Sequence, residues 1–423
     1  MTGRAHRYTR GGVGMRLGPK LSVIALVYVI EGFPMGVYQL WSVFFRRHEV
    51  SLAALGLLSG LSIAWSAKVL WSPLVDRFGE RRQWIAGSLG VMAACLVTIA
   101  GSDPRAIGLA LGMALALFCA ASATQDVAID AYTIGLVEPG EEGLANSVRI
   151  TAYRVGMSLL AGTGLFFLPA RVGWPATFLV AAALTAAMGA SVFACPRVAV
   201  PPESRRALWQ PLGHWLGRPG ALPVLCFVLL YRVGDRAMGP MVLPFWVDRG
   251  FDEAEIGVVS GTLGMLATVG GAAAGGALVS LAGIAPGLWW LGALALGSNL
   301  GYAAVAVHPE WGRAGMYGAA IAEHFCSGLA SAAFLSYLMR ICQKEHAAVQ
   351  YALLTALYAL AGSLASLPSG ALAEGMGYAG YFALTSAYAL PAFACLRGAS
   401  AWIGGEPARS ASPRARRPDS PPR

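Results

Sequence analysis

Two aspartates stand one helical turn apart at the end of a long apolar run. Residues 106–121 are apolar enough to form most of a membrane span, and Gln125, Asp126 and Asp130 follow them. An aspartate at the centre of a span costs about 2.5–3.5 kcal/mol to insert, and less near the ends. Side chains at i and i+4 share one helical face. We therefore expect both carboxylates to face a polar cavity, where they could exchange a proton or contact a substrate.

A group of basic residues opens the fifth apolar segment. The i, i+4 spacing places Arg149 and Tyr153 on one face and turns Arg154 away from it. A guanidinium fork suits carboxylates and phosphates, so all three residues are candidates for binding an acidic substrate. The structural alternative is an ion pair between these arginines and nearby acids, namely Glu138, Glu141, Glu142 and the two aspartates of the fourth span.

Two further charges lie in the first two apolar segments, and two polar residues open the eleventh. Glu31 and Lys68 could pair with each other or contact the substrate. Gln350 and Tyr351 combine an amide with an aromatic face, a combination that suits sugar binding. All four are candidates for the site, and Glu31 joins the aspartates as a candidate proton carrier.

The second half of the chain has its own charges within apolar segments. Arg232, Asp235 and Arg236 share one face at i, i+3 and i+4. They form either an internal ion pair or a cluster that binds the acidic end of a substrate. Glu323 has no evident partner in the sequence and is a further candidate for substrate or proton. His324 is rotated from it by about 100° and is expected to be packed rather than functional.

Composition assigns the chain to the membrane proteins. It is 56% hydrophobic and 13% charged over 423 residues, and a span needs about 20 mainly apolar residues. We predict an all-α integral membrane protein with twelve spans. Their expected limits are 20–42, 52–73, 83–101, 105–132, 146–168, 173–194, 221–246, 255–280, 286–307, 313–339, 346–372 and 378–397.

The basic residues predict the orientation. With the N-terminus in the cytoplasm, 21 of the 31 Lys and Arg residues fall on the cytoplasmic side, 6 on the outside and 4 within spans. An even number of spans then places the C-terminus there too. We expect a basic N-terminus (1–19), a six-helix bundle (20–195), a cytoplasmic central loop (196–220), a second bundle (221–397) and a disordered basic tail (398–423).

Other classes of protein fit less well. The net charge of +9 is spread over many loops of one face without an aromatic platform, which argues against nucleic-acid binding. The seven cysteines form no Cys-x-x-Cys pair, and no residue offers His324 a metal-ligand spacing, so we expect no metal and no cofactor. The first apolar run lacks a cleavage site and is expected to act as a signal-anchor.

The loop after the second span carries a recognisable pattern. It reads Ser72-Pro-Leu-Val-Asp-Arg-Phe-Gly-Glu-Arg-Arg82. Asp76 can accept hydrogen bonds from a helix end, Gly79 permits a tight turn, and Arg77 and Arg81 anchor the cytoplasmic side. With six spans on each side of a central loop, it resembles the signature of the major facilitator superfamily, whose halves rock about a central site. A basic loop that only obeys the charge rule is the alternative.

Several segments in register narrow the resemblance. They are residues 68–77, 122–132, 153–157, 231–235, 250–257, 323–328 and 350–354. In order and spacing they resemble the AmpG-type muropeptide permeases and the related acetyl-CoA transporters, over about residues 20–395. The resemblance implies a monomeric, proton-coupled transporter that imports anhydro-muropeptides across the bacterial inner membrane by alternating access. Its substrate would be an acidic sugar–peptide.

Two other functions remain open at this point. An acetyl-CoA carrier, or a carrier of another acidic metabolite, belongs to the same superfamily. A membrane acyltransferase would need a nucleophile or a His/Asp pair at the membrane surface, and the sequence offers only Glu323 and His324, on different faces. The sequence therefore favours a transporter over an enzyme.

Overall fold

Helices make up the chain in a computed structural model that describes residues 15–138, 141–198, 217–342, 347–400 and 402–403. Ten helices within these ranges are long and apolar enough to cross a membrane. Many of their large apolar side chains are exposed, for example Leu109 (81%), Trp290 (73%) and Leu281 (85%). Exposed apolar surface of this extent is suited to lipid rather than to water.

The first six crossings use straight and interrupted helices. Short 3-10 turns divide the second crossing, and a π-helical stretch continues the fifth. Their bounds are α1 (Leu17–Arg47); α2 (Leu52–Ser59), η1 (Gly60–Ser62), α3 (Ile63–Ala67), η2 (Lys68–Leu70) and α4 (Ser72–Arg77); α5 (Arg81–Ala100); α6 (Leu109–Leu136); α7 (Glu142–Arg154), η3 (Val155–Gly164) and η4 (Leu165–Phe167); and α8 (Pro169–Ser191) with η5 (Val192–Ala194).

The last six crossings bring the total along the described chain to the predicted twelve. The seventh is broken into α10 and α11, and the eleventh is α16 continued by the start of α17, so neither is among the ten long apolar helices. The bounds of these elements are α10 (Ala221–Leu230) and α11 (Val233–Asp248); α12 (Glu253–Ile256), η6 (Gly257–Leu263) and α13 (Gly264–Ala282); α14 (Ile284–Val307); η7 (Pro309–Trp311) and α15 (Gly312–Ile341); α16 (Ala347–Ser366); α17 (Ser369–Tyr388), which is divided at Gly377 between the last two crossings; and α18 (Leu390–Ser400).

The predicted boundary between the last two spans agrees with the structure. We expected the eleventh to run to residue 372 and the twelfth to begin at 378, and the chain reverses at Gly377, which has a φ of +73° inside α17. Ser363, Ser366 and Gly370 face successive residues of the second crossing, so the start of α17 continues the eleventh crossing in the direction of α16. A break at Pro368 separates α16 from α17 within that crossing, since a proline in the interior of a helix lacks the N–H that continues the hydrogen-bond ladder.

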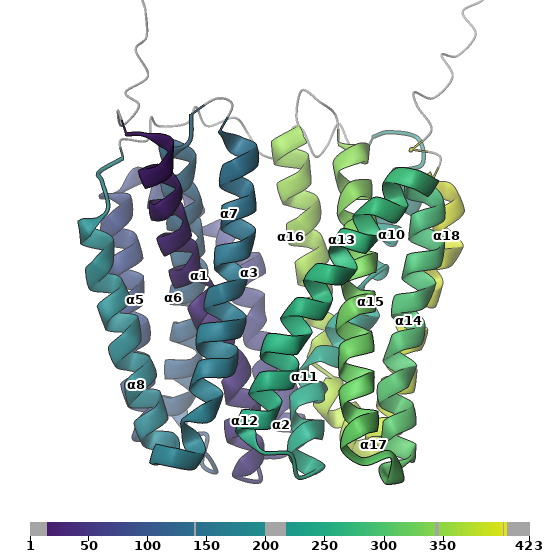
Figure 1. Ribbon diagram of the computed structural model, residues 1–423, viewed down its shortest axis with the longest axis horizontal. Coiled ribbons are helices and arrows are strands. Elements are labelled where there is room, and N and C mark those ends of the chain that lie inside the picture. The colour runs from purple at the N-terminus through teal and green to yellow at the C-terminus, as the bar shows by residue number, and fades with distance from the viewer. Residues whose placement is uncertain (1–14, 139–140, 199–216, 343–346, 401, 404–423) are drawn as a thin grey trace, which may run out of the picture.

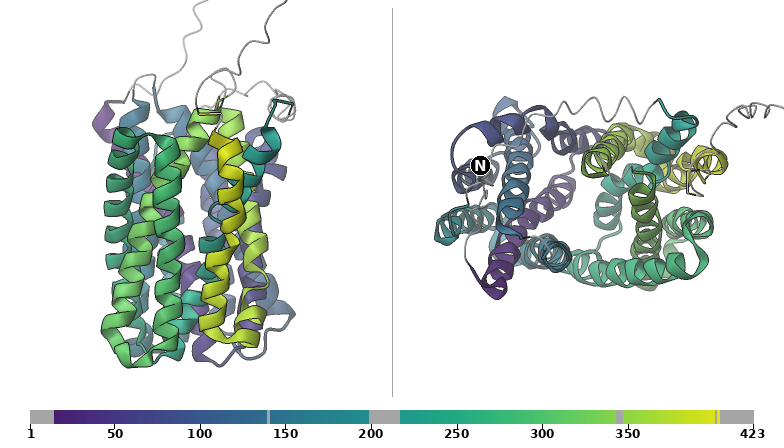
Figure 2. Two further views of the ribbon diagram at one scale, coloured as in Figure 1. Left: turned by 90° about the vertical axis from the view of Figure 1, so that its right-hand side faces the viewer. Right: turned by 90° about the horizontal axis from the view of Figure 1, so that it is seen from above.

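The helices form two groups that meet at one end. In Figure 1 the first six crossings, purple to blue, stand beside the last six, green to yellow, and Figure 2 shows the two bundles from above. We call the end where α1 begins and α18 ends the near end, and the opposite end, where α1 reaches Arg47, the far end.

Among the described residues, the part of the buried apolar core that the two halves share lies at the far end. One cluster runs through the first half and continues into far-end residues of the second, including Phe245, Trp246 and Tyr381. The other cluster lies wholly within the second half and includes Val224, Tyr337 and Leu396. The two halves are therefore packed together at the far end and separate towards the near end.

Candidate functional site

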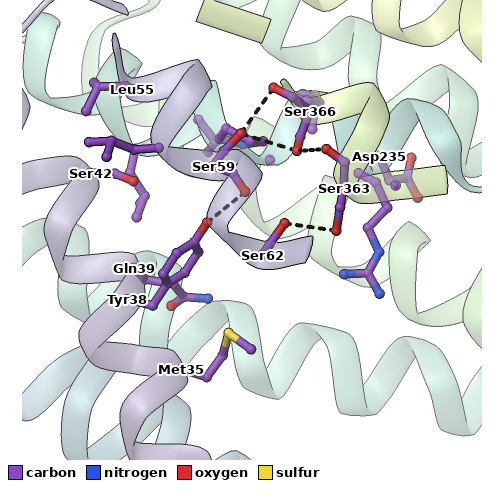
Figure 3. Close-up of a pocket in the computed structure, with 18 of the residues that line it drawn as sticks. Met35, Tyr38, Gln39, Ser42, Leu55, Ser59, Ser62, Asp235, Ser363 and Ser366 are labelled. Carbon is purple, nitrogen blue, oxygen red and sulfur yellow. Dashed lines mark hydrogen bonds between the residues drawn. The ribbon is translucent and has the colours of Figure 1, made fainter. Parts of the chain in front are cut away.

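A cavity of about 450 Å³ lies between the two halves (Figure 3). Residues from α1, α2, α3 and η1 line one side, and residues from α11, α15 and α16 line the other. The lining is chemically mixed, because aromatic rings, hydroxyl groups and ionisable groups all face the same cavity. The aromatic residues are Tyr38, Trp41, Phe45 and Trp65; the serines are Ser42, Ser59, Ser62, Ser66, Ser260, Ser363 and Ser366; the ionisable residues are Asp235, Arg236, Glu323 and His324.

A line of serines, which we call the serine seam, closes one side of this cavity. Ser62 Oγ donates to Ser363 Oγ at 2.9 Å, and Ser59 Oγ lies 3.2 Å from Ser366 Oγ. Tyr38 OH donates to the carbonyl of Ser59 at 3.1 Å, as Figure 3 shows. The seam joins the second crossing to the eleventh, so hydrogen bonds connect the halves directly beside the cavity.

Beyond the seam, the halves touch through glycines and ion pairs. Gly56 of α2 approaches Gly370 of α17 so closely that a Cβ on Gly56 would lie 2.5 Å from the Gly370 nitrogen. Arg46 forms two hydrogen bonds with Asp248, at 2.6 and 2.8 Å, and Asp248 also accepts from Tyr378. These contacts close the far end of the molecule.

Lys68 and Asp126 form an ion pair in the first half. Lys68 Nζ lies 3.3 Å from Asp126 Oδ2, and their side chains are 28% and 14% exposed. The sequence left open a pair between Lys68 and Glu31, but the partner of the Lys68 ammonium is Asp126 of α6. Glu31 Oε2 is buried and has no hydrogen-bond partner among the described residues. Burying such an oxygen in charged form is costly, and a neutral carboxyl relieves most of the cost.

Asp130 forms the ion pair with an arginine of the fifth crossing that the sequence left open as its structural role. Arg149 lies 2.8 Å from its carboxylate, and Tyr28 OH donates to the same oxygen at 2.8 Å. The Arg149 guanidinium also lies 4.6 Å from the centre of the Tyr28 ring. The Asp130 and Arg149 side chains are 41% and 36% exposed, so this ion pair is not enclosed by packed helices. The structure thus brings Asp130 and Arg149 together.

Tyr153 and Arg154 lie half-buried where α7 passes into η3. The backbone of Tyr153 packs against Gly32 of α1, where no side chain would fit. Among the described residues, none accepts a hydrogen bond from Arg154 or forms an ion pair with it. Gln125 is fully buried and donates to the Ile30 carbonyl at 3.1 Å, so it ties α6 to α1.

The seventh crossing is broken where its charges begin. Arg232 caps α11 with a non-helical backbone, lies 2.9 Å from Asp235, and donates to Ser327 and Ser331 of α15. Asp235 also accepts from Asn299 at 3.1 Å. The internal ion pair considered from the sequence is therefore present. It uses only two of the three charges, and Arg236 stands apart.

Arg236 reaches a different partner on α16. Its Nε donates to Tyr358 OH at 3.0 Å, and its guanidinium carbon lies 5.1 Å from the centre of the Tyr358 ring. The residue is exposed to the cavity that it lines. Glu323 does have a neighbour, because His324 Nδ1 lies 3.0 Å from its Oε2 and 2.9 Å from the Ala320 carbonyl oxygen. Adjacent side chains on a helix can meet at their tips, although their Cβ atoms point in different directions.

The two polar residues of the eleventh crossing lie away from the cavity lining. Gln350 is 1% exposed, and Tyr351 packs against the core cluster of the second half. Neither belongs to the cavity wall among the residues that line it.

The signature loop forms a compact corner at the near end. Gly79 adopts a φ of +70°, which confirms the expected tight turn. Arg77 lies over the Phe78 ring at 5.5 Å, and Arg81 donates to the Val75 carbonyl. The side chain of Asp76 lies outside the described part of the structure.

The arginine that follows holds this corner to the sixth crossing. Arg82 donates to the carbonyls of Phe193 and Cys195, at 3.1 and 2.6 Å, and pairs with Glu80. The Arg82 guanidinium lowers the pKa of the Glu80 carboxyl below its ordinary value of 4.5.

Sequence reasoning missed the serines and Tyr358. It also missed Gly362, which lines the cavity beside Arg236. Ser59, Ser62 and Ser66 recur at three and four residues, and Ser363 and Ser366 at three, so their shared helical faces were visible in principle. A serine costs little in a span because it can bond to its own helix, and isolated serines therefore give no signal.

The sequence is similar to a known protein family and to individual transporters. A family model described as Major Facilitator Superfamily matches residues 22–366. Anhydromuropeptide permease of Escherichia coli (strain K12) is 30% identical over 392 residues, which is 88% of this chain and 78% of the relative. Putative transporter AmpG 4 of Rickettsia felis (strain ATCC VR-1525 / URRWXCal2) is 25% identical over 393 residues, with 88% and 94% covered.

Solved structures share the fold. The nucleoside transporter NupG is 13% identical with a TM-score of 0.71, covering 90% of this chain and 100% of its own. A bacterial homolog to human lysosomal transporter Spinster, in an inward-facing and unoccupied conformation, is 14% identical with a TM-score of 0.68, covering 92% and 96%.

Proposed function

Because the chain belongs to the major facilitator superfamily, and within it to the anhydromuropeptide permeases, we propose that it imports anhydro-muropeptides across the bacterial inner membrane. It is a multi-pass membrane transporter and not an enzyme. The observation that carries the proposal is the cavity between its two halves. Its aromatic faces and serines suit a sugar, and its ionisable groups suit the charged ends of a peptide.

We also propose that the near end faces the cytoplasm and that the molecule is in an inward-facing state. The excess of Lys and Arg on that side supports the orientation. The contacts of α2 with α17 and of η3 with η6, with the shared core at the far end, support closure on the outer side. Rocking of the halves about the cavity would then open the far end in turn.

We propose that import is coupled to protons through Asp126 and Glu31. Lys68 compensates Asp126, whereas an oxygen of Glu31 lacks any described partner. A proton on this group of two carboxyls and one ammonium would change its net charge without breaking a backbone contact. Movement of the halves could then expose the same group to the two sides in turn.

Uptake into proteoliposomes tests the function. Vesicles that contain the purified protein should accumulate labelled anhydro-muropeptide, and an imposed inward proton gradient should increase the rate. Labelled acetyl-CoA in the same vesicles tests the related cargo. Absence of muropeptide flux, with and without the gradient, would rule out the proposed substrate.

A single substitution tests the coupling. Asp126→Asn keeps the size of the side chain and removes its charge, so uptake should lose its response to the proton gradient while exchange of internal for external substrate continues. Wild-type uptake with an unchanged response to pH would show that Asp126 plays no part in coupling.

A further inference from the structure

Most ionisable side chains in the middle of the second half already lie beside a partner that can carry the opposite charge. Arg232 pairs with Asp235 at 2.9 Å, and Glu323 pairs with His324 at 3.0 Å. Arg236 differs from them. Within the described residues, no carboxylate lies within ion-pair distance of its guanidinium, although it stands in the middle of a membrane crossing.

The surroundings of Arg236 fix the position of its guanidinium without neutralising it. Tyr358 receives the Nε hydrogen bond at 3.0 Å and places its ring against the guanidinium. Neither terminal nitrogen donates to any described acceptor. A guanidinium binds a carboxylate through paired N–H groups, so the terminal nitrogens are free to receive an anion from the cavity.

A glycine on the neighbouring helix makes room for the stem of this arginine. A Cβ on Gly362 would lie 2.8 Å from Arg236 Cγ, 3.0 Å from its Cβ and 3.3 Å from its Cδ. Any larger residue at position 362 would therefore push the stem away from α16. Gly362 and Tyr358 stand one helical turn apart on α16, so one face of this helix shapes both the stem and the tip of Arg236.

We propose that Arg236 is the receptor for the carboxylate of the substrate, held in place by Tyr358 and Gly362. This inference rests on the proposed function and assigns the acidic end of the cargo to the second half of the cavity. The serine seam and Trp65, which carry no charge, then face the neutral sugar. A substrate whose carboxylates are blocked cannot form the ion pair with Arg236. The guanidinium then stays without a negative partner when this substrate is bound.

The experiment compares an acidic anhydro-muropeptide with the same compound after amidation of its carboxylates. Uptake is measured for the wild type, Arg236→Gln, Gly362→Ala and Gly318→Ala. Gly318 is a matched control, because a methyl group there meets nothing within 4 Å. Thermal unfolding of each purified variant verifies that it is folded.

The wild type should prefer the acid by about 10- to 100-fold in KM, the range expected for a charged hydrogen-bonded pair. Arg236→Gln and Gly362→Ala should lose this preference by raising KM for the acid, with little change for the amide. Gly318→Ala should keep it. The inference is overturned if both substrates change equally, or if Gly362→Ala behaves like Gly318→Ala.

Binding separates this inference from the proposed function. Quenching of the tryptophan fluorescence of the purified protein reports both compounds, since Trp41 and Trp65 line the cavity. If the wild type transports neither compound, the proposed function fails. A binding preference for the acid that Arg236→Gln abolishes would still support the receptor, and equal binding of acid and amide would refute it.

Discussion

The closest approach between the halves makes a sharp prediction. Gly370 of α17 lies against the backbone of α2, where an added methyl would stand 2.8 Å from the nitrogen of Ala53 and closer still to the carbonyl of Leu52. Backbone atoms cannot rotate away as a flexible side chain can. Gly370→Ala should therefore disfavour every arrangement in which the far end is closed.

The size of the effect follows from the geometry. Ordinary contact begins at 3.4 Å, so a separation of 0.6 Å between α2 and α17, the difference from 2.8 Å, would relieve only the Ala53 nitrogen, and the Leu52 carbonyl, which lies closer to the added methyl, requires more. Overpacking of this kind costs about 1–3 kcal/mol. Because the methyl clashes only while the far end is closed, the ratio of open to closed molecules should rise about 5- to 150-fold.

Spin labels on opposite halves can measure this shift. Glu49 and Glu310 follow the far ends of α1 and α14, and their side chains are 84% and 64% exposed. Cysteines at these two positions, in a background without the seven native cysteines, would carry the labels. The distance distribution should move towards longer separations in Gly370→Ala.

A second glycine on the same helix supplies the control. Gly375 also lies on α17, but a methyl group there meets nothing within 4 Å. Gly375→Ala should keep the wild-type distribution. If the two variants gave the same distances, the close approach at Gly370 would not hold the far end closed, and our account of that end would be refuted.

Three further outcomes follow from the described contacts. Lys68→Gln should lower thermal stability and adding Asp126→Asn should restore part of it, because losing one partner of a buried pair costs about 3–5 kcal/mol, and less here since Lys68 is 28% exposed. Arg46→Gln should lengthen the same spin-label distances slightly and mimic high salt, since a partly exposed pair contributes about 0.2–1 kcal/mol. The pKa of Glu80 is lowered by Arg82, so that pair stabilises the fold above pH 4.5 and its contribution disappears as pH falls through the lowered pKa. Glu80→Gln should therefore melt earlier than the wild type at pH 7, and the difference in melting temperature should shrink as pH falls through the lowered pKa.

The number of crossings could be predicted because each leaves a long apolar run in the sequence. The positions at which a helix is broken within a crossing could not be predicted. The interruption of the seventh at Arg232 and the break of the eleventh at Pro368 occur inside apolar stretches. Their positions depend on whether neighbouring helices supply hydrogen bonds to the freed backbone, and that information is tertiary.

The charged residues of the site were identifiable for a similar reason. A charge inside an apolar run is rare, so Asp126, Lys68 and Arg236 stand out in the sequence. Their pairing was not identifiable, because Lys68 had acids on two different helices within reach. The spatial arrangement of three helices decides that Asp126 is the partner.

The serine seam bears on how easily the molecule can change state. When two apolar surfaces separate in water, the free-energy cost grows in proportion to the apolar area that becomes exposed. Hydroxyls that part from one another take water molecules as new partners, so the exchange of hydrogen bonds is close to balanced. A junction built from Ser59, Ser62, Ser363 and Ser366 can thus separate and rejoin many times with a small energetic difference between its dry and wet forms.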